Sequence, residues 1–156
     1  MLLETRALTA SYGQFRALFG VDIAVDAGEC VAIIGANGAG KSTLMRSITG
    51  VLRNEPGMVL HRGEPIGALA AADVLKRGIA MVPEGRKLFA SLSVEDNLLI
   101  GRYGRAVEGY WNLQTVYELF PILKERQGQS GAGTLRGHAA EVGIGVRACV
   151  VPPRGF

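Results

Sequence analysis

The sequence predicts an α/β fold built from short strands and helices that alternate along the chain. Its 156 residues are 48% apolar, which is the composition of a globular, core-forming protein. Short apolar runs bounded by glycine or proline alternate with segments of helical spacing up to about Thr134. Such an alternation of strand and helix patterns is typical of the α/β class.

Two longer strands are expected near the N-terminus, at residues 2–9 and 17–25. The second has apolar side chains at every second position, namely Phe19, Val21, Ile23 and Val25. Shorter strands are expected at residues 29–34, 58–60 and 79–82. The run at 29–34, ECVAII, is bounded by glycines and is consistent with a buried parallel strand, in which Cys30 is a small buried apolar residue.

Four helices are expected, at residues 41–49, 68–77, 93–100 and 112–120. The first follows a glycine-rich loop, and the second is rich in alanine and ends at Gly78. Ser93 is the expected N-cap of the third helix, which has acidic residues in its first turn. The fourth ends before Pro121.

Charge and cysteine content exclude several classes of protein. The net charge is +3, and three arginines and one glutamate within residues 136–156 supply most of it. No basic stripe is interleaved with aromatic residues, so no nucleic-acid partner is expected. The two cysteines form no C-x-x-C pair, so neither a disulfide framework nor a zinc site is indicated.

The sequence shows neither a membrane-spanning segment nor a secretion signal. No apolar run reaches the roughly 18 residues that span a bilayer. The first residues, MLLETR, lack the basic-then-apolar layout of a signal peptide. We therefore expect a cytoplasmic protein that needs a partner for any membrane association.

A glycine-rich loop carries the chemistry. It matches G-x-x-x-x-G-K-[ST] and consists of Gly35, Ala36, Asn37, Gly38, Ala39, Gly40, Lys41, Ser42 and Thr43. In such a loop, successive N–H groups point at one anion, and the following helix adds its dipole. Lys41 is expected to reach the β- and γ-phosphates of ATP, and the Ser42 hydroxyl to bind Mg²⁺. A chance glycine-rich turn is the alternative, but the expected strand before the loop and helix after it favour the phosphate site.

The wider pattern resembles the ATP-binding subunits of ABC transporters. The residues that carry the likeness are Ser11-Tyr12-Gly13, Ala17-Leu18, Ala27-Gly28-Glu29 and GANGAGKST. Residues 78–89 (GIAMVPEGRKLF), 92–98 (LSVEDNL) and 116–121 (VYELFP) resemble the branched-chain amino acid importer branch. The resemblance covers about residues 2–135. It implies a P-loop NTPase fold of the α/β class, an ABC-type nucleotide-binding domain that is incomplete in this chain.

The resemblance assigns two further residues. Tyr12 matches the aromatic residue that stacks on adenine, and because the ring face does the stacking, the hydroxyl is expected to be dispensable. A half-buried tyrosine at a strand end is the alternative. Glu84 stands where most ABC proteins have a glutamine that senses the γ-phosphate and contacts the membrane subunit. It is our candidate catalytic residue, and a solvated loop acid after Pro83 is the alternative. A Walker-B-type acid is disfavoured, because Pro83 separates Glu84 from the strand expected at residues 79–82 and the following Gly85-Arg86 fits the sensing loop better.

Several later elements of this family are not found in the 156 residues: the Leu-Ser-Gly-Gly-Gln signature, the Walker B aspartate, the catalytic glutamate and the switch histidine. A one-nucleotide shift in the codons from Leu135 onward permits Ser-Gly-Gly-Met-Gln-Gln-Lys-Leu, which resembles the signature. We therefore expect residues 1–135 to be the N-terminal part of the domain and residues 136–156 to be a frameshifted, non-native tail. A genuine short protein, whose tail packs on the sheet, is the alternative.

The resemblance implies a function and partners. The chain is expected to be the ATP-binding subunit of an importer of branched-chain amino acids, held at the inner face of the membrane by permease subunits and paired with a second ATP-binding subunit. As given, it is expected to bind ATP without efficient hydrolysis. An importer of urea or short amides and a non-catalytic nucleotide-binding fragment are the alternatives. A P-loop GTPase is disfavoured because the sequence has no Asn-Lys-x-Asp base reader.

Overall fold

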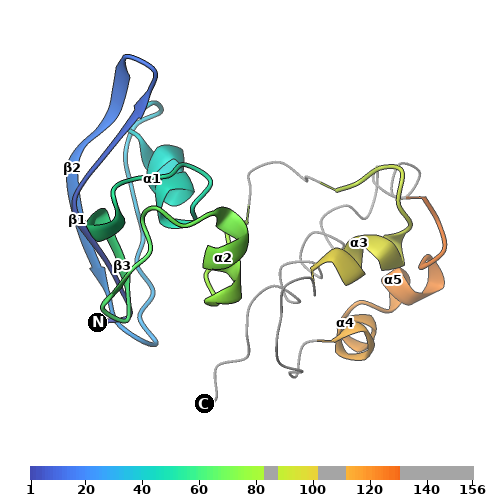
Figure 1. Cartoon of the computed structure of the whole chain (residues 1–156). Helices are drawn as coiled ribbons and strands as arrows, with labels where there is room; N and C mark the ends of the chain where they lie inside the picture. The colour runs from blue at the N-terminus through green and yellow to red at the C-terminus, as the bar shows by residue number, and fades with distance from the viewer. Residues whose placement is uncertain (83–87, 102–111, 131–156) are drawn as a thin grey trace. The chain divides into compact units, whose positions relative to one another are not determined.

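The computed structural model describes residues 1–82, 88–101 and 112–130, and the chain divides into two compact units. The first unit, Met1–Met81, contains the sheet and two α-helices, and the described residues of the second, Val82–Phe156, form three α-helices (Figure 1). The expected division at residue 135 remains a prediction, because residues 131–156 lie outside the described part of the chain.

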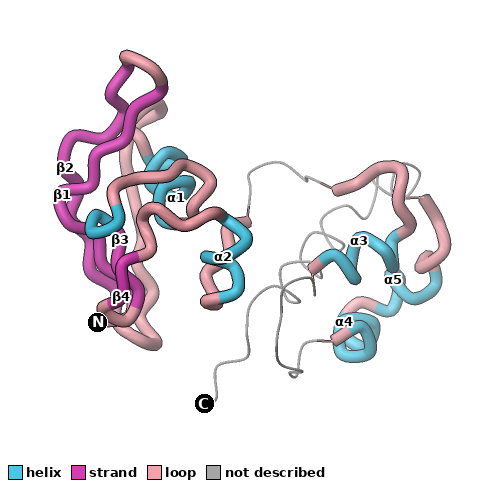
Figure 2. The backbone as a smooth tube through the Cα atoms, in the orientation of Figure 1, coloured by secondary structure: helices cyan, strands magenta, loops and turns pink. Residues whose placement is uncertain are grey.

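The sheet of the first unit has four strands in the order β2-β1-β3-β4, and all its pairings are antiparallel (Figure 2). Its strands are β1 (Leu3–Tyr12), β2 (Phe15–Val25), β3 (Val59–His61) and β4 (Glu64–Pro65). A short 3₁₀ helix, η1 (Pro56–Met58), precedes β3. The two long strands and the short strand near residue 59 therefore agree with the sequence prediction.

The alternation expected along β2 is interrupted by a bulge. Gly20 has a left-handed φ of 90°, and the pairing steps from Leu8–Val21 to Thr9–Phe19 around it. The extra residue reverses the face on which the following side chains lie. Phe19 is therefore 76% exposed, whereas the core receives Leu18, which is 4% exposed.

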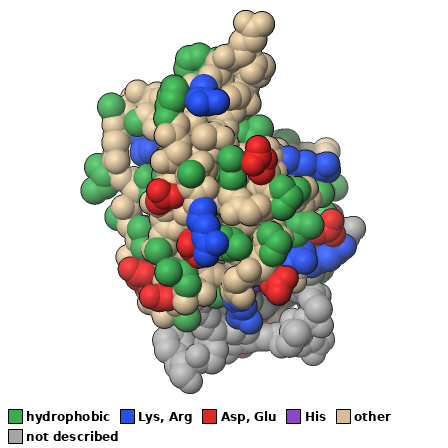
Figure 3. All heavy atoms as spheres, turned by 60° about the vertical axis from the view of Figure 1, so that its left-hand side comes forward, with side chains coloured by type: hydrophobic (Ala, Val, Ile, Leu, Met, Phe, Trp, Pro, Cys, Tyr) green, Lys and Arg blue, Asp and Glu red, His purple; other side chains and the backbone are tan. Residues whose placement is uncertain are grey.

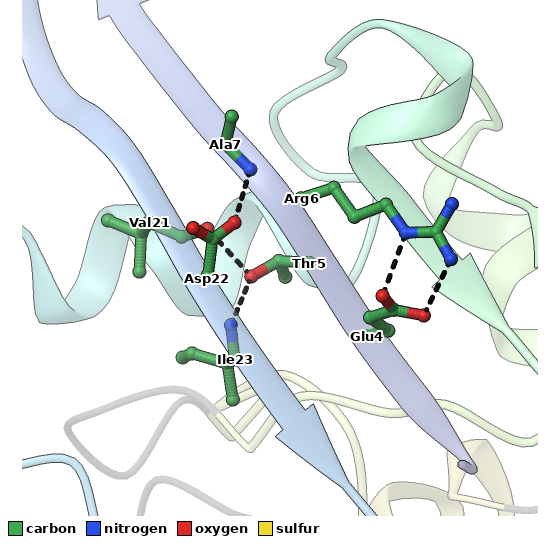
Figure 4. Close-up of polar contacts among 7 residues, drawn as sticks. All are labelled: Glu4, Thr5, Arg6, Ala7, Val21, Asp22 and Ile23. Carbon is green, nitrogen blue, oxygen red and sulfur yellow. Dashed lines mark hydrogen bonds and ion pairs between the residues drawn. The ribbon is translucent and has the colours of Figure 1, made fainter.

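A second bulge lies nearer the start of β1 and is closed by side chains (Figure 4). The Thr5 hydroxyl donates a hydrogen bond to the Val21 carbonyl (2.8 Å) and accepts one from the Ile23 N–H (2.9 Å). The Asp22 carboxylate accepts a hydrogen bond from the Ala7 N–H. These contacts satisfy backbone groups that the regular strand ladder leaves out at a bulge.

The core of the first unit lies between this sheet and two helices, α1 (Lys41–Ile48) and α2 (Ala71–Lys76). It is formed by Leu8, Ala10, Leu18, Leu44, Ile48, Val59, Ile66 and Val74. Leu44 and Ile48 are four residues apart and so share the face of α1 that is buried. Packing of this face fixes α1, and with it the loop that precedes α1.

The expected parallel strand at residues 29–34 is not formed. These residues are in no strand and are exposed, with Ile34 92% exposed, and Cys30 is exposed rather than buried. A strand requires a neighbour for its backbone N–H and C=O groups. No other segment among the described residues pairs with 29–34. The strand expected at 79–82 is likewise absent from the described residues 79–82.

The second unit contains α3 (Val94–Ile100), α4 (Leu113–Leu119) and α5 (Pro121–Glu125). Ser93 caps α3 and forms a reciprocal capping box with Asp96, which confirms the predicted helix start. Pro121 ends α4 as expected, but it also opens α5, which the sequence analysis missed. Proline is favoured at a first helical position because it has no N–H to leave unpaired.

These three helices pack around a small apolar cluster formed by Val94, Leu98, Val116, Tyr117 and Leu123. The Tyr117 hydroxyl donates a hydrogen bond to Glu95, 3.3 Å away, and so connects α4 to α3. Burial of the Tyr117 side chain, together with the negative charge of Glu95, raises its pKa to about 12. The phenol is therefore neutral over the physiological range.

The face seen in Figure 3 carries apolar side chains interspersed with basic and acidic ones. Among the described helices, none combines the length and apolar character needed to cross a bilayer.

Candidate phosphate-binding site

The glycine-rich loop folds back on itself before it enters α1. Gly38 and Gly40 have left-handed φ angles of 85° and 86°, a conformation that glycine adopts without steric cost. Within the loop, the Ala39 N–H donates a hydrogen bond to the Ala36 carbonyl (3.2 Å). Gly40 is the N-cap residue, and the helix begins at Lys41.

Gly40 also packs closely against β2. A Cβ at position 40 would lie 2.8 Å from Leu18 Cδ2 and 2.9 Å from the Ala17 carbonyl oxygen. A Cβ at Gly38 would meet nothing within 4 Å. The two glycines therefore have the same backbone conformation, but only Gly40 is pressed against the sheet.

The N-terminus of α1 is suited to an anion. Its N-cap residue offers no side-chain hydrogen bond, and its first turn contains no acidic residue. The first N–H groups of a helix have no partner within the helix, and the helix dipole places partial positive charge there. A phosphate group would supply oxygen acceptors and negative charge at this end of α1.

Lys41 lies against the loop that precedes it. Its Nζ donates hydrogen bonds to the carbonyl oxygens of Gly35 and Ala36, each at 2.7 Å. The loop residues Asn37, Gly38 and Ala39 are exposed to solvent. The structure therefore places the lysine ammonium beside the loop, and its contact with phosphates remains a prediction.

The two hydroxyl residues of the motif differ in exposure. Ser42, the expected Mg²⁺ ligand, is exposed in the first turn of α1, whereas Thr43 is only 9% exposed. No cluster of three or more His, Cys, Asp or Glu side chains occurs in the described ranges. The Ser42 hydroxyl is an oxygen donor of the kind that binds Mg²⁺, an ion that commonly enters with substrate phosphates and takes few protein ligands.

Tyr12, at the end of β1, lies beside this helix. Tyr12 is 43% exposed, and its hydroxyl accepts a hydrogen bond from Arg46 Nη1 at 3.4 Å. A hydrogen bond with Thr43, followed by the bond and charge of Arg46, holds the pKa of Tyr12 below its usual range. The structure thus places Tyr12 next to a residue of the phosphate-binding motif.

The contribution of Arg46 was missed from the sequence. Its only signal there is its position, three residues after Thr43 and thus one turn further along the same face of the helix. The strand end that supplies Tyr12 is more than thirty positions away in the chain, so the contact depends on tertiary packing.

Glu84 lies outside the described residues. The described segment nearest to it on the C-terminal side is held by Asn97, which is 2% exposed. The Asn97 side-chain amide accepts a hydrogen bond from the Phe89 N–H (2.8 Å) and donates to the Phe89 carbonyl (3.0 Å). Asn97 therefore fixes Phe89 against α3, and the role of Glu84 stays a prediction.

Comparison with protein families gives a match to the ABC transporter model over residues 18–147. The branched-chain amino acid transport ATP-binding protein BraG of Pseudomonas aeruginosa is 40% identical over 137 residues, which are 87% of this chain and 58% of BraG. The probable branched-chain amino acid transport ATP-binding protein LivF of Archaeoglobus fulgidus is 36% identical over 137 residues, again 87% and 58% of the two chains. The chain thus spans somewhat over half the length of these relatives.

Solved structures of ABC-transporter proteins also resemble this chain. A solved ATP-binding cassette of an ABC transporter superposes with a TM-score of 0.74 at 27% identity, over 97% of this chain and 66% of the other. The α/β fold class predicted from the sequence is confirmed by this likeness.

Proposed function

Since the chain belongs to the ABC transporter family, we propose that it is an ATP-binding part of an importer of branched-chain amino acids. One observation carries the ATP-binding part: an uncapped helix N-terminus follows a loop with two left-handed glycines, and a lysine ammonium lies against that loop. The transport names of BraG and LivF support the solute class.

In this proposal, the N–H groups of residues 35–40 and of the first turn of α1 hold the phosphate chain. Lys41 exchanges its two carbonyl partners for β- and γ-phosphate oxygens. The Ser42 hydroxyl binds Mg²⁺, and the Tyr12 ring stacks on adenine. Bound Mg-ATP supplies the phosphoanhydride whose hydrolysis drives transport.

The remaining parts of the proposal come from the family. Permease subunits and a second ATP-binding subunit are the proposed partners, and Glu84 is the proposed sensor of the γ-phosphate. Because the 156 residues contain no signature, Walker B aspartate or catalytic glutamate in the family pattern, we propose that this chain by itself binds ATP with little turnover. The attacking water then lacks its orienting residue.

Replacement of Lys41 by alanine tests the proposal. We expect Lys41→Ala to weaken Mg-ATP binding by at least about tenfold, since a charged hydrogen-bond donor to the phosphates is lost. Fluorescent ATP-analogue titration measures the affinity. Lys76→Ala is the control, because Lys76 is an exposed lysine of the same unit that pairs with Asp73. Equal affinities of Lys41→Ala and the unmodified chain would rule out the phosphate site.

A further inference from the structure

The Tyr12 hydroxyl joins the end of β1 to the helix that follows the phosphate-binding loop. Arg46 Nη1 donates a hydrogen bond to this oxygen at 3.4 Å, and the nearby Thr43 side chain helps to lower the pKa of Tyr12. Thr43 and Arg46 are three residues apart on α1 and therefore lie on one helix face. The phenol oxygen thus has two neighbours on the same face of α1, and Arg46 is the one that donates a hydrogen bond to it.

Thr43 and Arg46 differ in their burial and in their other contacts. Thr43 belongs to the phosphate-binding motif and is only 9% exposed, so its position is set by the packing of α1. Arg46 is exposed, and none of the ion pairs found in residues 1–82, 88–101 and 112–130 includes it. Its described partner is the Tyr12 hydroxyl.

We propose that Arg46 is a positioning residue for the base of the bound nucleotide: its hydrogen bond holds the Tyr12 hydroxyl against α1, and so fixes the Tyr12 ring relative to the phosphate-binding loop. The inference rests on the proposed function, since it requires that the loop binds phosphates and that the ring stacks on the base. A ring that is already held loses less rotational freedom when the base binds. The hydroxyl is then needed for base affinity, contrary to the expectation from the sequence.

Two ligands separate base binding from phosphate binding: Mg-ATP, and Mg-tripolyphosphate, which has no base. Calorimetric titrations of the full chain are expected to show about a fivefold to tenfold loss of ATP affinity in Tyr12→Phe and in Arg46→Met, the loss typical of one hydrogen bond. Tripolyphosphate affinity stays unchanged in both. The double variant binds ATP no more weakly than Tyr12→Phe alone, because the two changes remove the same contact.

Two control variants test the chemistry of position 46. Arg46→Lys keeps a charged donor and is expected to retain most of the ATP affinity. Arg53→Met removes one positive charge from another exposed position of the first unit, and is expected to change neither affinity. A loss in Arg53→Met as large as that in Arg46→Met would mean that net charge, rather than the contact with Tyr12, decides binding.

The ionisation of Tyr12 gives a readout that is independent of nucleotide. The difference between the absorbance titrations of the unmodified chain and of Tyr12→Phe isolates this phenol from the other three tyrosines. Thr43 and Arg46 lower the pKa of Tyr12, so Arg46→Met is expected to raise it. An unchanged pKa would show that Arg46 does not hold the hydroxyl.

The outcomes distinguish this inference from the proposed function. If Arg46→Met leaves ATP affinity intact while Lys41→Ala weakens it as predicted, the inference is wrong and the proposed function stands. If Arg46→Met weakens ATP and tripolyphosphate equally, Arg46 acts on the phosphates and the inference is wrong. If the unmodified chain binds neither ligand, the proposed function itself fails. Should Arg46→Met not fold, Arg46→Gln is subject to the same criteria.

Discussion

Position 40 of the phosphate-binding loop requires glycine for two reasons, its backbone conformation and its close packing. Its φ angle is left-handed, and its α-carbon lies so close to β2 that a methyl group would collide with Leu18 and with the Ala17 carbonyl. Gly38 shares the backbone conformation but has open space around it. The two positions therefore separate the cost of a strained backbone from the cost of a collision.

We predict that Gly40→Ala is clearly more harmful than Gly38→Ala. A left-handed alanine costs about 1–2 kcal/mol at either position. At position 40 the collision with the sheet adds about 1–3 kcal/mol, because backbone cannot move aside as a flexible side chain can. Urea unfolding of both variants measures the difference. Equal midpoints would show that the loop is not pressed against β2.

At the scale of the element, the β1–β2 hairpin depends on the side chains that close its first bulge. Thr5 is 2% exposed, and its hydroxyl both donates to the Val21 carbonyl and accepts from the Ile23 N–H. Valine has nearly the same shape but cannot form either bond. This hairpin carries Tyr12 at the end of β1 and supports the loop through Leu18 and Ala17.

Thr5→Val is accordingly expected to destabilise the chain by about 1–3 kcal/mol, because it leaves two backbone groups without partners. Thr9→Val on the same strand is the control, since the Thr9 hydroxyl makes only a 3.8 Å contact with the Met58 sulfur. We expect this control to change stability by no more than about 0.5 kcal/mol. Thermal unfolding followed by circular dichroism compares the two, and a larger loss in Thr9→Val would contradict the assignment.

Elements with a clear local pattern, such as the start of α3 and the two strands of the first hairpin, could be predicted from the sequence, whereas the pairing of residues 29–34 and the bulge in β2 could not. The start of α3 follows from Ser93 and Asp96, which lie within one turn of each other and cap the helix by themselves. The strand expected at residues 29–34 has a suitable composition, but its formation depends on neighbouring strands that the described residues do not supply. The exposure of Phe19 depends on the bulge at Gly20, which apolar spacing alone does not reveal.

The same distinction applies to the candidate site. The loop with Lys41 and Ser42 was predictable because its residues are consecutive, and the chemistry of a phosphate cradle requires that spacing. The contact of Tyr12 with Thr43 and Arg46 joins a strand end to a helix, so only the folded chain reveals it.

At the scale of the whole molecule, the proposed function belongs to the first of the two units. The loop, α1 and Tyr12 all lie within Met1–Met81. The family match begins at residue 18 and continues into the second unit, to residue 147. The first unit therefore contains the candidate contacts for phosphate and base, while Glu84 lies outside the described residues.

The most direct test of phosphate binding by residues 35–43 is nuclear magnetic resonance of the isotope-labelled chain. The amide resonances report on each of these residues separately. On addition of Mg-ATP, the account predicts the largest shifts at the N–H groups of Gly38, Gly40 and Lys41, because these groups exchange solvent for phosphate oxygen. Mg-tripolyphosphate should shift the same resonances. Binding of Mg-ATP that leaves these three resonances in place, with the largest shifts in α4 and α5 instead, would contradict the account.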